Sequence, residues 1–163
     1  MFQDRVGTVG GGVVADLHMP TLRRATATDR SAIVALLSAE KLPVADLDAE
    51  KISGFLVAED GTDLLGLIGV ELYGTVGLLR SLVITRNARR LGLGSKLVGA
   101  LESAADAAGV TELWLLTIDA QQYFDRLGYH LVGRDDAPES IRESGEFSRL
   151  CPESAHLMMK RLY

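Results

Sequence analysis

A run of arginines and glycines near residue 90 has the residue types best suited to chemistry. It consists of Arg89-Arg90-Leu91-Gly92-Leu93-Gly94-Ser95 and lies between a strand-like apolar stretch and a helix-like stretch. A helix N-terminus presents unpaired backbone N–H groups and carries about half a positive charge, so it binds phosphate. Glycines let a ligand approach the backbone closely, and Arg86 adds to the positive charge. The pattern indicates an anion site, or else a surface loop whose glycines only form a turn.

This loop differs from two better-known phosphate motifs. The chain has no Walker A spacing, and Leu97 stands where a Rossmann fingerprint needs its third small residue. The segment Gly10–Ala15 does match G-x-G-x-x-A, but only Val6–Val9 precedes it, and Pro20 follows too soon for a helix. An NAD-dependent oxidoreductase would depend on that segment alone.

Length and composition describe one globular domain. The chain has 163 residues, of which 47% are hydrophobic and 24% charged, close to globular averages. Residues 1–19 contain four glycines and no amphipathic period. We therefore expect an N-terminal extension over 1–19, outside the core, and a single domain over 20–163.

Charge and cysteine usage exclude several classes of function. A net charge of −5 gives no basic field for nucleic acid, and no apolar run approaches the ~18–20 residues that span a membrane. With Cys151 as its one cysteine, the chain can form no intramolecular disulfide and no cysteine-rich metal cage, which fits a reducing cytoplasm. The three histidines lack metal-ligand spacing, so we expect no metal.

Apolar periodicity gives the elements that must position the loop. The expected order is βαα-βββ-α-β-α-β-β, a mixed α/β domain, with an Asp60-Gly61 hairpin turn inside an antiparallel meander. A helix with an apolar stripe follows the arginine–glycine loop and stops at Gly109. The expected strands are 22–25, 55–58, 64–73, 78–84, 113–118, 129–133 and 155–162. The expected helices are one that starts within 26–29 and is closed by Pro43, then 47–52, 95–108 and 120–127.

Two signatures in this order resemble the GNAT N-acetyltransferases. Arg89-x-x-Gly92-x-Gly94 fits that family's coenzyme motif [QR]-x-x-G-x-[GA] at a strand-to-helix junction. The segment Ala120-Gln121-Gln122-Tyr123-Phe124-Asp125-Arg126-Leu127-Gly128-Tyr129 resembles the second signature, A-x-x-[FY]-[FY]-x-x-x-G-[FY]. The resemblance covers roughly residues 22–162. It implies a mixed, mostly antiparallel central sheet with one splayed parallel pair of strands and flanking helices.

A narrower likeness is to the arsenic-resistance subgroup of these enzymes. It is carried by four stretches outside the coenzyme motif, which we expect to describe the acceptor side: 42–48, 69–74, 78–82 and 146–155. The subgroup label describes a genetic setting and names no substrate.

The resemblance implies that acetyl-CoA is the co-substrate. Its pyrophosphate would lie on the amides of the loop, and its pantetheine arm along a strand. The implied coenzyme-binding residues are Leu82, Val83, Ile84, Arg89, Arg90, Leu91, Gly92, Leu93, Gly94 and Ser95. The three strand residues are equally expected to pack in the core.

The family's usual acid and base are replaced in this chain. Many relatives place a glutamate on the strand before the coenzyme loop, whereas Leu78–Leu82 holds no carboxylate; the common tyrosine acid is replaced by Phe124. Glu71, in an apolar strand, is the substitute base, because burial would raise its pKa toward neutrality. The alternative is a solvent-facing or hydrogen-bonded strand residue. Arg80 could bind an anionic acceptor group or form a structural ion pair, and Tyr123 is expected to line the cleft.

The sequence thus favours an acetyl-CoA-dependent N-acetyltransferase acting on a small, amino-acid-like or toxic amine. The alternative is an acyl-CoA-binding sensor or interaction module with little or no catalysis. We expect no nucleic-acid or membrane partner. Antiparallel edge strands and the polar 134–154 loop leave room for a homodimer.

Overall fold

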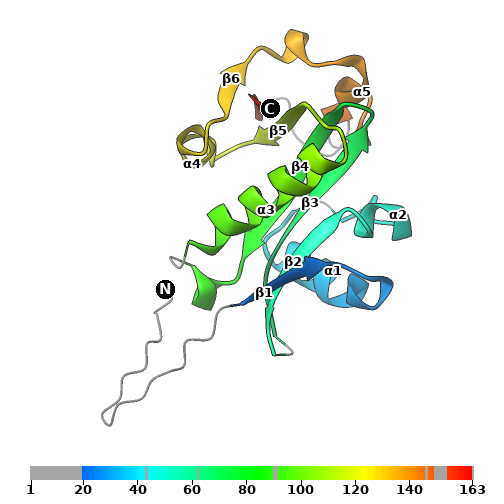
Figure 1. The fold of residues 1–163 in the computed structure, drawn as a ribbon, viewed down its shortest axis with the longest axis vertical. Helices are drawn as coiled ribbons and strands as arrows, with labels where there is room; N and C mark the ends of the chain where they lie inside the picture. Colours follow the sequence, from blue (N-terminus) through cyan, green and yellow to red (C-terminus); the bar gives the residue numbers. More distant parts are fainter. Residues whose placement is uncertain are drawn as a thin grey trace.

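The computed structural model describes residues 20–42, 44–61, 63–89, 92–145, 147–148 and 154–162. Strands and helices follow one another in the predicted order (Figure 1). The strands are β1 (Thr21–Arg24), β2 (Phe55–Asp60), β3 (Asp63–Tyr73), β4 (Val76–Ile84), β5 (Glu112–Thr117), β6 (His130–Val132) and β7 (His156–Arg161). The α-helices are α1 (Arg30–Ala39), α2 (Ala49–Ile52), α3 (Leu93–Ala107), α4 (Gln121–Arg126) and α5 (Glu139–Arg142).

The described strands form one seven-stranded sheet in the order β1-β2-β3-β4-β5-β7-β6. Neighbouring strands run antiparallel except β4 and β5, which run parallel. The predicted meander β2-β3-β4 is confirmed, and its turns contain Gly61 and Gly74 with φ of 67° and 68°. These left-handed values favour glycine because it has no Cβ. The mixed sheet implied by the resemblance is confirmed as well.

Helices cover both faces of the sheet (Figure 1). Side chains alternate between the faces along β3: Leu67 packs with α1 and α2, and Ile68 with α3. A third apolar cluster lies around Trp114 and Ile141, where α5 covers β5 and β7. The predicted amphipathic stripe of α3 is buried at Leu97, Leu101 and Ala105.

The structure differs from the predicted elements mainly in irregular segments. Helix α2 begins at Ala49 instead of Leu47, because Leu47 is buried in the core and Asp48 caps the helix by accepting from the Lys51 amide. Helix α5 and two short 3₁₀ turns, at Arg86–Ala88 and Arg134–Asp136, fall where loops were expected, and a third 3₁₀ turn, Ala27–Asp29, lies at the predicted start of the first helix. Such single turns are too short to give a periodic pattern.

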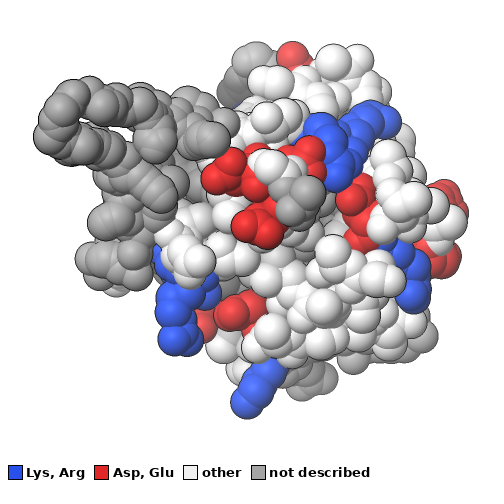
Figure 2. Space-filling model, turned by 90° about the horizontal axis from the view of Figure 1, so that it is seen from below, with Lys and Arg blue, Asp and Glu red and all other residues white. Residues whose placement is uncertain are grey.

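The surface in Figure 2 mixes both signs of charge. Lysines and arginines form small groups between groups of aspartates and glutamates, and no broad basic face appears in that view. Within the described residues, no helix is long and apolar enough to cross a membrane. The same residues contain no group of three or more histidines, cysteines or carboxylates placed to hold a metal ion.

Candidate functional site

The parallel strands β4 and β5 separate after a short ladder. Their register joins Val76, Gly77 and Leu78 to Glu112, Leu113 and Trp114. Beyond it, β4 continues along β3 and β5 along β7. A groove of about 440 Å³ opens between them, lined by residues 79–82 of β4 and 115–120 at the end of β5. An extended ligand can lie there, because a strand whose neighbour has diverged offers backbone groups to an added chain.

A β-bulge at Ser81 accompanies this separation. Leu67 pairs with Val83 but Gly69 pairs with Arg80, so β4 carries one extra residue at this point. Ser81 has a φ of 63°, a left-handed value that is uncommon for a residue other than glycine. A bulge bends its strand and increases the twist, which directs β4 away from β5.

The predicted anion loop lies at the end of β4, at the N-terminus of α3. Gly92 precedes the helix with a φ of 75°, and its carbonyl accepts from the Lys96 amide. The first amides of a helix have no acceptor within it, so those of Leu93, Gly94 and Ser95 are available to an anion. Arg90 and Leu91 lie outside the described residues.

This helix end and the strand opening belong to one continuous groove. The part at α3 is lined by Leu82, Val83 and Ile84 of β4 and by residues 92–95. Both parts share Glu40, Leu42, Leu82, Asp119 and Tyr123. The side chains of Leu82, Val83 and Ile84 also pack against the two cores, so the expectation that they pack in the core is met. Their contact with a coenzyme stays a prediction. The groove suits a long ligand with an anionic end.

Arg89 borders the helix end from the side. It is exposed, its Nε donates to the Ile84 carbonyl at 3.0 Å, and its guanidinium lies 3.6 Å from Glu40. The first contact holds the side chain over the end of β4. The nearby guanidinium adds positive charge where the helix amides are exposed.

Tyr123 lies between the two parts of the groove. Its ring packs edge-on against Phe124, at 5.2 Å between centroids, and its hydroxyl lies against Gly94. A methyl group on Gly94 would collide with that hydroxyl. Phe124, at the position of the family's usual acid, is 5% exposed and belongs to the core beside Tyr129.

A buried polar cluster lies on the other side of the bulge. Arg80 Nη1 donates to Glu71 Oε2 and to Asp46 Oδ2, each at 2.7 Å, and Nη2 donates to Asp46 Oδ1 at 3.2 Å. Arg80 Nε donates to Ser81 Oγ at 3.1 Å, which ties the cluster to the bulge. The side chains of Arg80, Glu71 and Asp46 are 1%, 8% and 11% exposed.

Electrostatics keep this cluster charged. Burial raises the pKa of Asp46, but the hydrogen bonds and charge of Arg80 lower it by more, so that the net pKa lies below the usual value. Asp46 is therefore a carboxylate at neutral pH. Neither Asp46 nor its pairing with Arg80 could be read from the sequence, because 34 residues separate the partners.

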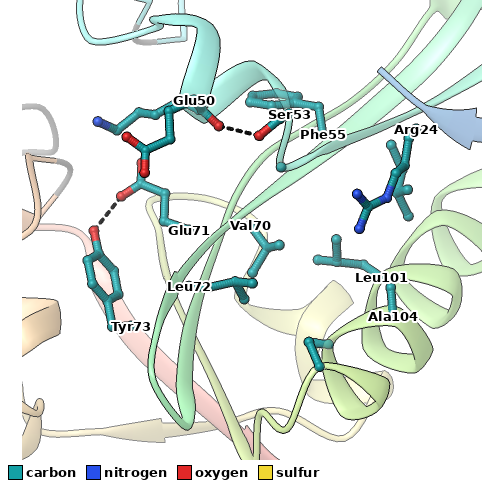
Figure 3. Close-up of a pocket in the computed structure, with 15 residues that line it drawn as sticks. Arg24, Glu50, Ser53, Phe55, Val70, Glu71, Leu72, Tyr73, Leu101 and Ala104 are labelled. Carbon is teal, nitrogen blue, oxygen red and sulfur yellow. Dashed lines mark hydrogen bonds between the residues drawn. The ribbon is translucent and has the colours of Figure 1, made fainter. Parts of the chain in front are cut away.

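Glu71 lines a different cavity from the predicted coenzyme residues. Figure 3 shows this cavity, of about 370 Å³, with Glu71 and Tyr73 on one side of β3 and Val70 and Leu72 on the other. The Tyr73 hydroxyl donates to Glu71 Oε1 at 2.6 Å. The structure thus brings Glu71 to Arg80, and Arg80 lines the groove. The role of Glu71 as a base stays a prediction.

Comparisons with known proteins agree with this geometry. Residues 21–129 match the model of a family described as Acetyltransferase (GNAT) family. An uncharacterised N-acetyltransferase of Chlorobaculum tepidum is 32% identical over 56% of this chain and 59% of that protein. An amino-acid acetyltransferase of Ralstonia nicotianae is 26% identical over 98% of this chain and 35% of that protein.

A solved structure shares the fold. The N-acetylglutamate synthase of Neisseria gonorrhoeae, complexed with coenzyme A and N-acetyl-glutamate, superposes with a TM-score of 0.78 at 22% identity over 91% of this chain and 36% of that one. The chain therefore spans little more than half of the first relative, and about a third of the amino-acid acetyltransferase and of the synthase.

Proposed function

Because the chain belongs to the acetyltransferase (GNAT) family, we propose that it transfers an acetyl group from acetyl-CoA to the amine of a small, amino-acid-like acceptor. Acetyl-CoA supplies a thioester whose carbonyl carbon takes the amine nitrogen, with release of the coenzyme thiol. The observation that supports this best is the continuous groove from the α3 N-terminus to the opening between β4 and β5.

The residues of the groove fit the coenzyme. The α3 amides and Arg89 would hold the pyrophosphate, because this end of a 15-residue helix combines unpaired N–H groups with a positive dipole. The strand residues 82–84 would hold the pantetheine arm through backbone groups.

Arg80 and Tyr123 are the proposed acceptor-side residues. Arg80 lines the groove beside the bulge, and a guanidinium binds a carboxylate through two parallel hydrogen bonds. Tyr123 lines both parts of the groove, so its ring would separate coenzyme from acceptor. The name of the Ralstonia relative supports an amino-acid-like acceptor.

Proton transfer is proposed to involve Glu71. An ammonium group must lose a proton to become a nucleophilic amine, and the nitrogen loses a second proton when the amide forms. A carboxylate beside the acceptor site can take such a proton, directly or through a water. Phe124 has no proton to give, so the departing thiolate would take its proton from solvent or from the Tyr123 hydroxyl.

Turnover with a panel of amines tests the proposal. Thiol release from acetyl-CoA is followed with the standard amino acids, their amides and simple amines, and the product is identified by mass. We expect thiol release that depends on one class of amine. Absence of amine-dependent release from a protein that still binds acetyl-CoA would contradict it.

That outcome would favour the second candidate, an acyl-CoA-binding module without catalysis. The observation in its favour is that both oxygens of Glu71 accept hydrogen bonds, from Tyr73 and Arg80, as in a purely structural ion pair.

The subgroup likeness extends the proposal to toxic acceptors. Arsenic-containing and other toxic amino acids therefore belong in the panel. Cells that express the protein should survive such a compound and gain no protection against arsenite, which has no amine. Protection against arsenite would contradict this part of the proposal.

A further inference from the structure

The connection between α1 and α2 forms one wall of the groove. Glu40 and Leu42 line both parts of it, and Lys41 lines the part between the strands. The far end of the connection is fixed, because Leu47 is 3% exposed and its carbonyl accepts from Arg30 Nε and Nη2 at 3.3 and 3.1 Å. Asp46 precedes this fixed point.

Asp46 pairs with Arg80 in the geometry that the carboxylate of a bound ligand would adopt. Two oxygens of one carboxylate face two nitrogens of the guanidinium, at 2.7 and 3.2 Å. This side-by-side pairing is the geometry by which arginine recognises the carboxylate of a ligand. Arg80 lines the groove but its side chain is 1% exposed, so an acceptor carboxylate could pair with the guanidinium only by taking the place of a carboxylate that it already holds.

Of the two carboxylates on Arg80, Asp46 is the one that can leave. Glu71 lies within β3, in register with Leu78 of β4, and also accepts from Tyr73. Glu71 is thus held by a second partner as well as by its place in a central strand. Asp46 lies outside the described strands and helices.

A third carboxylate cannot simply join the cluster. Asp46 and Glu71 already approach the same Nη1 atom, and both are nearly buried. Like charges at such distances repel strongly where water is excluded. Exchange of one carboxylate for another leaves the local charge unchanged, so it avoids that repulsion.

We infer that Asp46 is a specificity-determining residue that holds the place of the acceptor carboxylate on Arg80 and is displaced when the acceptor binds. The inference rests on the proposed acetyl transfer to an amino-acid-like amine, and it adds the residue with which the acceptor competes.

Asp46→Asn tests the inference with two matched acceptors. The probes are the standard amino acid that is acetylated fastest and its α-carboxamide, which differ only in the carboxylate. Asparagine keeps the shape of Asp46 but replaces a charge-assisted hydrogen bond by a weaker neutral one. We expect the KM of the amino acid to fall about five- to tenfold, because its competitor is weaker. The KM of the carboxamide should stay within about twofold.

Two control variants distinguish competition between carboxylates for Arg80 from a general loosening of the connection between α1 and α2. Asp46→Glu keeps the charge, and should keep the ratio of the two KM values near that of the parent. Asp48→Ala removes the N-cap of α2 and loosens the same connection without changing the carboxylate on Arg80. It should leave the ratio unchanged. Three results would overturn the inference. In Asp46→Asn, the KM of the amino acid could rise, or the KM values of both acceptors could shift equally. In Asp48→Ala, the ratio of the two KM values could shift as much as it does in Asp46→Asn.

A binding measurement distinguishes failure of the inference from failure of the proposed function. Thermal melting with coenzyme A and 10 mM of each standard amino acid or its α-carboxamide, about ten times the upper end of usual KM values, reports acceptor binding without turnover. If no amine is acetylated, the proposed function fails. The inference then stands if at least one standard amino acid, but not its α-carboxamide, raises the melting temperature more in Asp46→Asn than in the parent, and falls if none does. Turnover of amines without a carboxylate, and of no amino acid, would overturn the inference alone.

Discussion

Gly94 stands at the second position of α3, with the hydroxyl of Tyr123 lying against it. A Cβ at this position would collide with that oxygen, whereas the ring carbon behind it, Cζ, would lie at 3.4 Å, an ordinary contact. Gly94→Ala should therefore push Tyr123 into the groove and raise the coenzyme Kd about tenfold, in line with the ~1–3 kcal/mol of overpacking. Calorimetric titration with coenzyme A measures this.

Tyr123→Phe in the same background provides the control. Removal of the one clashing atom should return the Kd of the double variant to within about threefold of the Tyr123→Phe single variant, since coupled sites are non-additive. If the double variant binds coenzyme A as weakly as Gly94→Ala alone, the glycine is needed because the ligand approaches it closely, and not because the Tyr123 hydroxyl lies against it.

Glu71→Gln tests the proposed base. Glutamine keeps the length of the side chain; its oxygen can still accept from Arg80, while its NH2 group can donate to the Tyr73 hydroxyl, so coenzyme affinity should change little. Loss of a general base lowers kcat by about 10²–10⁴-fold, so we expect a fall in that range at neutral pH. The loss should shrink at high pH, where more amine arrives deprotonated. The measurement is kcat from pH 6 to 10.

If Glu71 has a purely structural role, we expect a different result. The variant would then lose some stability, retain kcat within a few-fold and show the parent's pH profile. That result would remove Glu71 from the mechanism and leave solvent as the proton acceptor.

At the scale of elements, the start of the first helix shows what local sequence can predict. Thr26 and Asp29 indicated a helix start, and the Thr26 amide does donate to Asp29 Oδ2 at 2.7 Å. The sequence did not predict that Arg23 of β1 pairs with Asp29 through two bonds of 2.9 Å and also with Glu59 of β2. Residue 59 comes next to residue 23 only when β1 and β2 pair.

At the functional site, too, features formed by neighbouring residues could be predicted and those formed by distant residues could not. The anion loop could be predicted because its two glycines and the start of the following helix lie within one run of seven residues, 89–95. The bulge at Ser81 was not predicted, since serine carries no signal for a left-handed φ and the cause is the register between β3 and β4. The Arg80 cluster joins a loop to two strands, so only the folded chain brings its residues together.

Acid titration tests the Arg23–Asp29 pair. Hydrogen bonds from Arg23 hold the pKa of Asp29 well below its usual range. A lowered pKa stabilises the fold above the unfolded value of about 4, and the contribution is lost as the pH falls below it. Asp29→Asn should reduce the unfolding free energy by about 1 kcal/mol at pH 7, a modest figure because Arg23 is partly exposed.

The gap between parent and variant should therefore begin to narrow as the pH falls below about 4 and should close only at the lower pH at which Asp29 becomes protonated in the folded protein. Urea unfolding of both proteins at several pH values measures the gap. A constant gap would show that the carboxylate acts through the capping hydrogen bond alone and not through its charge.

At the scale of the whole molecule, the three described cores draw their residues from positions 22–162. Because residues 1–19 contain four glycines and no amphipathic period, we propose that they are dispensable and that 20–163 is the folding domain. A variant that begins at Met19 should keep its melting temperature within about 2 °C, since a loss of 1 kcal/mol already shifts Tm by roughly 2–8 °C. It should also keep its affinity for coenzyme A. A lower Tm or a weaker affinity would place part of the N-terminal segment in the domain.

The sheet consists of two halves, β1–β4 and β5–β7, joined directly by the three-residue ladder of β4 and β5. A coenzyme between the diverging strands would contact both halves, so its binding should stabilise the molecule as a unit. At one hundred times Kd the expected gain is about 2.7 kcal/mol. Amide exchange should slow in residues 82–84, at the α3 N-terminus and in residues 115–117 across the groove. Gly92→Val is the matched control, because valine is strained at a φ of 75° and should lower both affinity and protection. Protection confined to the α3 N-terminus, with none in residues 115–117, would show that the ligand binds the helix end without lying between the strands.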